Sequence, residues 1–105
     1  MRESEIMARK LPTIDPGTSW NVRDIPGLGK LVRNQRAHSG LRIDDAAALC
    51  GVSADVLSRL ENGKPVTLDK LLLVLQGLGL HMVVLPARHA VALAPALQAI
   101  SDPQA

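Results

Sequence analysis

The sequence predicts an all-α domain of four or five helices that contains a helix-turn-helix and ends in one short strand. Three observations predict this fold. The chain has 105 residues and is 47% hydrophobic but only 1% aromatic, so its core must be aliphatic, as in small helical bundles. Residues 25–79 form short segments of helical periodicity separated by glycines. Residues 80–85, LHMVVL, form the one apolar run that is typical of a strand.

The stretch 46–63, AAALCGVSADVLSRLENG, predicts two short helices joined by a tight turn. Gly51 lies where the chain must reverse, a position that favours a positive φ. Ser53 is a good N-cap for the second helix, and Leu57 and Leu60, three residues apart, form its inward face. The outward residues, which could meet DNA, are Ser53, Ala54, Asp55, Ser58, Arg59 and Asn62.

Capping residues predict where the other helices begin and end. Asp24 and Pro26 start the first helix, which ends at Gly40, and the second opens at residues 42–45 with two acids in its first turn. Thr67 caps the fourth helix. The expected buried faces are Leu28, Leu31 and Val32 in the first helix, Ala46, Ala47, Leu49 and Cys50 in the second, and Leu68, Leu71, Leu72, Leu75 and Leu78 in the fourth.

The strand expected at residues 80–85 needs a partner, because a lone strand leaves its N–H and C=O groups unpaired. Pairing with the same strand of a second copy across a two-fold axis would satisfy them. The alternative is that this run is irregular core. The expected dimer interface consists of Leu80, His81, Met82, Val83, Val84 and Leu85.

Composition divides the chain into three parts. Residues 1–24 mix charges with proline and glycine and are expected to form a flexible arm, in which Trp20 either docks onto the bundle or awaits a partner. Residues 25–86 are expected to form the DNA-binding and dimerisation domain. Residues 87–105 are expected to be a flexible tail, with a frayed helix near residues 96–100 or none.

Charge and cysteine usage narrow the class of protein. The net charge is +2, and residues 25–86 carry seven basic and five acidic side chains, which does not by itself indicate nucleic acid. The single cysteine, Cys50, excludes an internal disulfide and fits a reducing cytosol; on its apolar face it is expected to be a small buried hydrophobe. We expect a cytoplasmic protein with no membrane segment, because the apolar run 71–85 is shorter than the roughly 20 residues of a membrane span.

No set of residues indicates catalysis or metal binding. His38, His81 and His89 have no Cys, His or acid at metal-ligand spacing. A glycine-rich phosphate loop, a carboxylate pair and a Ser/His/Asp set are all lacking in the sequence. We therefore expect a protein that is not an enzyme and needs no cofactor.

Three segments resemble a known family. LVRNQRAHSGL, AALCGVSADVLSRLENGKP and TLDKLLLVLQGLGLHMVVL are similar to the Xre/Cro-type helix-turn-helix family, whose domain has the lambda-repressor-like fold. The resemblance covers about residues 27–85. The C-terminal strand and the overall layout look like the HipB-type antitoxin branch. That branch implies a dimeric DNA-binding autorepressor that also restrains a HipA-like toxin kinase.

The resemblance implies roles for individual residues. Ala54, Asp55, Ser58 and Arg59 fall where the family contacts base edges, and the Arg59 guanidinium suits guanine O6 and N7. Arg36 and Glu61 match a structural ion pair. The second helix opens with Arg42-Ile43 where the family has Thr-Gln or Ser-Gln, so Arg42 could replace a phosphate contact. The expected phosphate contacts are Lys30, Arg33, Arg42, Ser53, Asn62 and Lys64.

These observations lead to three hypotheses. The first is a homodimeric, sequence-specific repressor, bound to a palindromic operator at the nucleoid, with two Ser53–Asn62 helices in major grooves about 34 Å apart. The resemblance makes it the antitoxin of a two-gene pair. The second is a protein-interaction module with weak DNA binding, because Ala54 and Asp55 stand where the family often has Gln or Arg. The third is a stand-alone transcriptional regulator.

Overall fold

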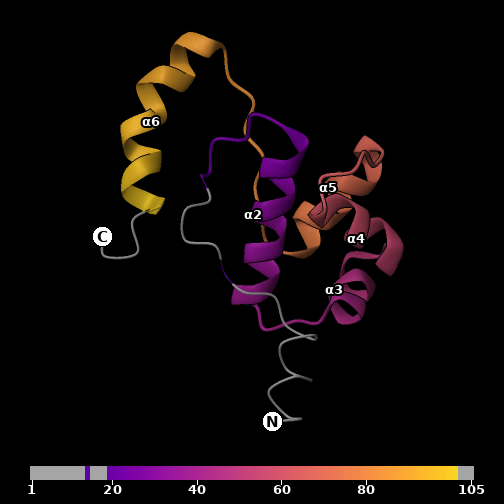
Figure 1. Cartoon of the computed structure of the whole chain (residues 1–105). Coiled ribbons are helices and arrows are strands. Elements are labelled where there is room, and N and C mark those ends of the chain that lie inside the picture. Colours follow the sequence, from indigo (N-terminus) through magenta and orange to yellow (C-terminus); the bar gives the residue numbers. More distant parts are fainter. Residues whose placement is uncertain (1–13, 15–18, 102–105) are drawn as a thin grey trace.

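The computed structural model describes residue 14 and residues 19–101, with the side chains of the latter range up to residue 100. This part of the chain forms five helices, labelled as in Figure 1. They are α2 (Ile25–His38), α3 (Ile43–Cys50), α4 (Ala54–Glu61), α5 (Leu68–Gly77) and α6 (Ala87–Ser101). Helices α2 to α5 pack together as one bundle, whereas α6 stands apart from it (Figure 1). The all-α prediction is thus confirmed for the described residues, while most of the arm at 1–24 and the last residues, 102–105, lie outside them.

The helix boundaries follow the capping signals of the sequence at most positions. The Asp24 carboxylate accepts a hydrogen bond of 2.8 Å from the Gly27 amide and caps α2. The Ser53 hydroxyl accepts one of 3.1 Å from the Val56 amide and caps α4. Thr67 precedes α5, but its side chain caps no backbone amide. It instead hydrogen-bonds the carboxylate of Asp69, which lowers the pKa of that exposed acid.

An aliphatic core lies between α2, α3, α4 and α5. Val32, Leu57, Leu60 and Val74 have no more than 1% of their surface exposed. Ala46, Ala47, Cys50, Leu75 and Leu78 complete the core. Val32 of α2 and Val74 of α5 therefore belong to the same core as Leu57 and Leu60 of α4.

The prediction for the buried face of α5 was partly wrong. Leu68 and Leu72 are 63% and 43% exposed, whereas Val74, which was not in the predicted stripe, is fully buried. The sequence of α5, LDKLLLVLQG, is apolar almost all round, so its periodicity fits two stripes that are rotated relative to each other. Leu49 in α3 is likewise 60% exposed, because Ala46, Ala47 and Cys50 form the inward face of that short helix.

Two glycines allow the helices to approach closely. A Cβ atom at Gly29 would collide with the backbone carbonyl oxygen of Leu60, so α2 crosses directly over the end of α4. A Cβ atom at Gly77 would lie 2.6 Å from the sulfur of Cys50, so α5 crosses α3 in the same way. Cys50 is buried as expected, its Sγ atom lies 3.6 Å from the Val74 carbonyl oxygen, and desolvation raises the pKa of its thiol.

The strand predicted at residues 80–85 was wrong for the single chain. Residues 80–86 have no regular secondary structure, and the described residues contain no strand. The physical reason is that a strand requires a neighbouring backbone, and the described part of one chain supplies none at this segment. Its apolar side chains are exposed instead, Met82 by 49%, Val83 by 64% and Val84 by 83%.

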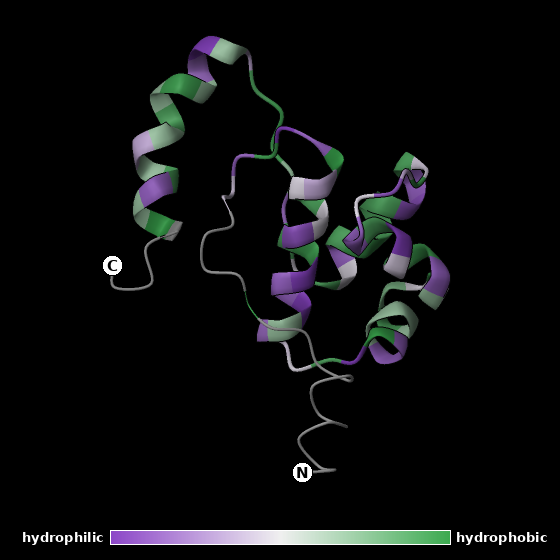
Figure 2. Ribbon diagram, viewed as in Figure 1, coloured by the Kyte–Doolittle hydropathy of each residue, from purple (hydrophilic) through white to green (hydrophobic). Residues whose placement is uncertain are grey.

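The C-terminal helix is longer than the frayed helix that the sequence predicts near residues 96–100. α6 has 15 residues and contains Pro95. Figure 2 shows that hydrophobic residues recur along it and along the segment that leads into it, and Val91 and Ile100 are 75% and 68% exposed.

Trp20, at the other end of the described chain, is 40% exposed. Within the described residues no helix is long and apolar enough to cross a membrane.

Candidate nucleic-acid interface

The α3–turn–α4 segment has the helix-turn-helix geometry that the sequence predicts. Gly51 ends α3 with φ +75°, and its amide donates to the Ala48 carbonyl oxygen at 3.2 Å. The Val52 amide donates to Ala47 at 3.0 Å, which closes the turn. Because only glycine adopts this left-handed conformation readily, Gly51 sets the angle at which α4 leaves α3.

Helix α4 has one face fixed in the bundle and one face outside it. Leu57, Leu60 and Glu61 are buried. Asp55 and Arg59 are exposed, and Ala54 and Ser58 are half-buried. Of the four side chains that were predicted to contact base edges, Asp55 and Arg59 thus lie on the outer side of α4, Ser58 lies at its edge, and Ala54 packs against the core. Arg59 donates from Nη2 to the Pro65 carbonyl oxygen at 3.2 Å, which keeps its guanidinium over the loop that follows α4.

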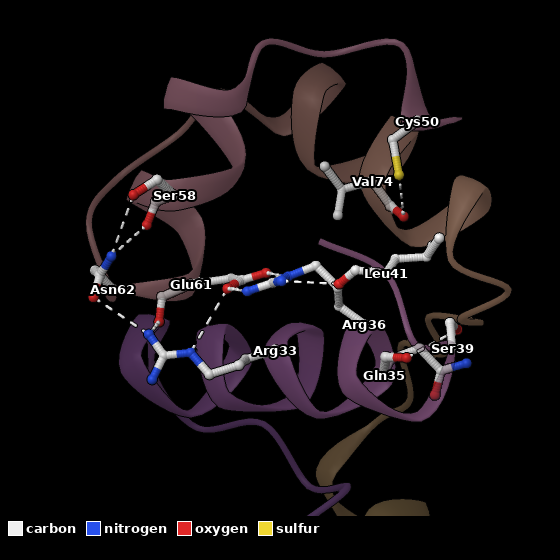
Figure 3. A network of polar contacts seen from close by, with 10 residues as sticks. All are labelled: Arg33, Gln35, Arg36, Ser39, Leu41, Cys50, Ser58, Glu61, Asn62 and Val74. Carbon is white, nitrogen blue, oxygen red and sulfur yellow. Dashed lines mark hydrogen bonds and ion pairs between the residues drawn. The ribbon is translucent and has the colours of Figure 1, made fainter. Parts of the chain in front are cut away.

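A buried ion pair fixes α4 against α2. The Nε and Nη2 atoms of Arg36 donate to the two carboxylate oxygens of Glu61 at 2.6 and 2.7 Å. Nη1 of Arg36 donates to the Leu41 carbonyl oxygen at 3.0 Å, so the same guanidinium also holds the connection between α2 and α3 (Figure 3). Both side chains are almost fully buried, 7% and 2% exposed. This is the ion pair that the family resemblance implies.

Two of the expected phosphate contacts, Arg33 and Asn62, lie against each other. Nη2 of Arg33 donates to the Asn62 Oδ1 atom and to the Glu61 carbonyl oxygen, both at 3.3 Å (Figure 3). Nδ2 of Asn62 donates to the Ser58 carbonyl oxygen at 2.8 Å. The sequence contained a signal for this contact that the prediction did not use. Arg33 precedes Arg36 by three residues, so both side chains reach the same side of α2.

The other expected phosphate contacts also lie on the surface of the described residues. Lys30, on α2, and Lys64, after α4, are exposed. Arg42 is exposed and lies 3.5 Å from the carboxylate of Asp45 one turn along α3. Ser53 uses its hydroxyl as the N-cap of α4. Among the residues that the structure describes, no group of three or more His, Cys, Asp or Glu side chains could hold a metal ion.

The residues of this bundle also match a family model. The model described as Helix-turn-helix domain matches residues 28–87, which is more than half of the chain and includes most of α2 and all of α3 to α5. A search of curated proteins found no match. On the geometry of α3 and α4 and on the extent of this match, the chain belongs to the helix-turn-helix domain family.

Proposed function

We propose that this protein is a sequence-specific DNA-binding repressor of transcription that acts as a homodimer. The observation that carries the proposal is the division of α4 into two faces. Leu57, Leu60 and Glu61 anchor it in the bundle, while its outer side chains are left to enter a major groove, as the second helix of a helix-turn-helix does. The basic side chains of Lys30, Arg33 and Lys64 lie on the elements next to α4, where phosphate contacts would orient it.

The exposed apolar segment supports the homodimer. Met82, Val83 and Val84 are between 49% and 83% exposed in one chain, a cost that a soluble domain normally avoids. Antiparallel pairing of residues 80–85 with the same segment of a second copy would satisfy the backbone groups and cover these side chains. It would also supply the two recognition helices that a palindromic operator requires.

We further propose that the repressor is the antitoxin of a two-gene pair and neutralises a HipA-like kinase. The support for this step is the resemblance of the C-terminal segment, residues 80–85, and of the overall layout to the HipB-type branch. A kinase-like reading frame next to the gene would favour it, whereas an isolated gene would favour a stand-alone regulator.

One observation favours a second candidate, a protein-interaction module with weak DNA binding. Asp55 is exposed in the first turn of α4. A carboxylate at this position repels phosphates unless it accepts a hydrogen bond from a cytosine N4 amino group. The exposed side of α4 that carries Asp55 would therefore also suit a protein partner with a basic surface.

Binding to DNA from the protein's own promoter, measured at several salt concentrations, separates these candidates. A DNA-binding dimer should bind a palindromic site tightly, and log K should fall against log salt by about 0.9 for each phosphate contact. Weak binding that is the same for a scrambled duplex would contradict the repressor and favour the interaction module.

A further inference from the structure

Two arginines of α2 share one carboxylate of α4. Arg36 occupies both oxygens of Glu61 at 2.6 and 2.7 Å, while Nε of Arg33 lies 3.6 Å from one of them. Among the described residues, Glu61 is the one acid within ion-pair distance of either arginine. One positive charge is therefore left over. It belongs to Arg33, whose side chain is 40% exposed, rather than to the buried Arg36.

Hydrogen bonds fix the direction in which this surplus charge points. Nη2 of Arg33 donates to the Glu61 carbonyl oxygen and to Oδ1 of Asn62. Nδ2 of Asn62 donates to the Ser58 carbonyl oxygen at 2.8 Å and lies 3.4 Å from the Ser58 hydroxyl. The Asn62 amide is thus held at both ends, and this orientation turns its oxygen toward Arg33. Nη1 of Arg33 has no hydrogen-bond partner among the described residues and points away from Glu61 and Asn62 (Figure 3).

We propose that Arg33 is a pre-positioned phosphate-binding guanidinium and that Asn62 is a positioning residue that acts through it. The sequence predicts a phosphate contact for Asn62 itself. The structure instead uses its amide to hold Arg33, and the free Nη1 donors of Arg33 would bind the phosphate. A guanidinium that is already fixed loses less conformational entropy on binding than a mobile one. The inference rests on the proposed DNA-binding function.

The test is a double-mutant cycle in the full chain, with the promoter duplex as the probe and salt concentration as the variable. Arg33→Gln should lower affinity by about ten-fold and reduce the salt slope by about 0.9 for each bound copy. Asn62→Ala removes no charge, so a direct contact by Asn62 would leave the slope unchanged. If Asn62 acts through Arg33, Asn62→Ala also reduces the slope, and it has no further effect in the Arg33→Gln background. Arg88→Gln, which removes one charge from α6, is the matched control and should leave the slope unchanged.

The substituted chains should fold, which thermal unfolding would verify. Asn62 is exposed and has φ −95°, a conformation that alanine adopts without strain. Equal losses from Asn62→Ala in both backgrounds, with an unchanged slope, would show that Asn62 contacts DNA itself and would overturn the assignment. If Arg33→Gln binds like the unsubstituted protein, the inference fails while the proposed function stands. If the unsubstituted protein binds no DNA, the proposed function fails first and the inference falls with it.

Discussion

Glu61→Gln tests whether the buried ion pair holds the recognition helix in place. The substitution keeps the shape of the side chain but removes the one negative charge that faces Arg36, and Arg36 is only 7% exposed. Breaking a buried pair in this way costs about 3–5 kcal/mol, because the remaining charge stays buried without compensation. Domains of this size are stabilised by only about 5–15 kcal/mol. The variant should therefore lose a large part of its stability, and its Tm should fall by at least about 12 °C.

Thermal and urea unfolding, followed by circular dichroism at 222 nm, would measure the effect. Asp45→Asn is the matched control, since it removes a carboxylate from an exposed pair, 3.5 Å from Arg42, and should change stability by less than about 0.5 kcal/mol. Replacing both partners, Arg36→Met with Glu61→Leu, should recover most of the loss because no charge is then left buried. A Glu61→Gln variant within about 1 kcal/mol of the unsubstituted protein would refute this reasoning.

Three further predictions concern helix α4, the proposed dimer and the core. Arg59→Ala should weaken binding to the promoter site by about 1–3 kcal/mol and relax one operator position in a footprint; unchanged affinity and specificity would remove Arg59 from base recognition. Val83→Asp should give a monomer in sedimentation equilibrium, because it would bury an unpaired charge in the paired segment; a variant that stays dimeric would contradict strand pairing. Cys50 should react slowly with iodoacetamide at pH 8 and rapidly in urea, since burial raises the pKa of its thiol above the ordinary 9.0. Because the folded state favours the protonated thiol, the free energy of unfolding is highest below the pKa of the unfolded thiol and falls as the pH rises through the pKa of the folded one. Equal alkylation rates in buffer and in urea would contradict the burial of the Cys50 thiol.

The sequence predicts the helix ends of the bundle well because their signals are local. Asp24 and Ser53 each bond an amide three residues along, and Gly51 adopts its positive φ at the turn. Such caps depend on a few neighbouring residues, which the sequence shows directly. The orientation of α4 is also predicted, because Leu57 and Leu60 must both face the core and the opposite side of this short helix is then left outside.

The features that the sequence predicted wrongly depend on the tertiary arrangement. The face of α5 is set by how it crosses α3 at Gly77, and a helix that is apolar all round does not reveal that angle. Helix α6 is longer than the helix expected near residues 96–100, although it contains Pro95. The alanines around it favour helix, and the structure carries the proline inside α6. A strand at residues 80–85 would need a neighbouring strand, and a sequence read as one chain does not show whether such a neighbour exists.

The shared carboxylate of Glu61 links the stability of the domain to its proposed interface. Arg36 uses that carboxylate to hold α4 against α2, while Arg33, whose side chain is 40% exposed, lies 3.6 Å from the same carboxylate. Glu61→Gln should therefore impair folding and DNA binding together, whereas Arg33→Gln should impair binding alone. A pair of variants that separates the two effects would show that one acid serves the core through Arg36 and the interface through Arg33.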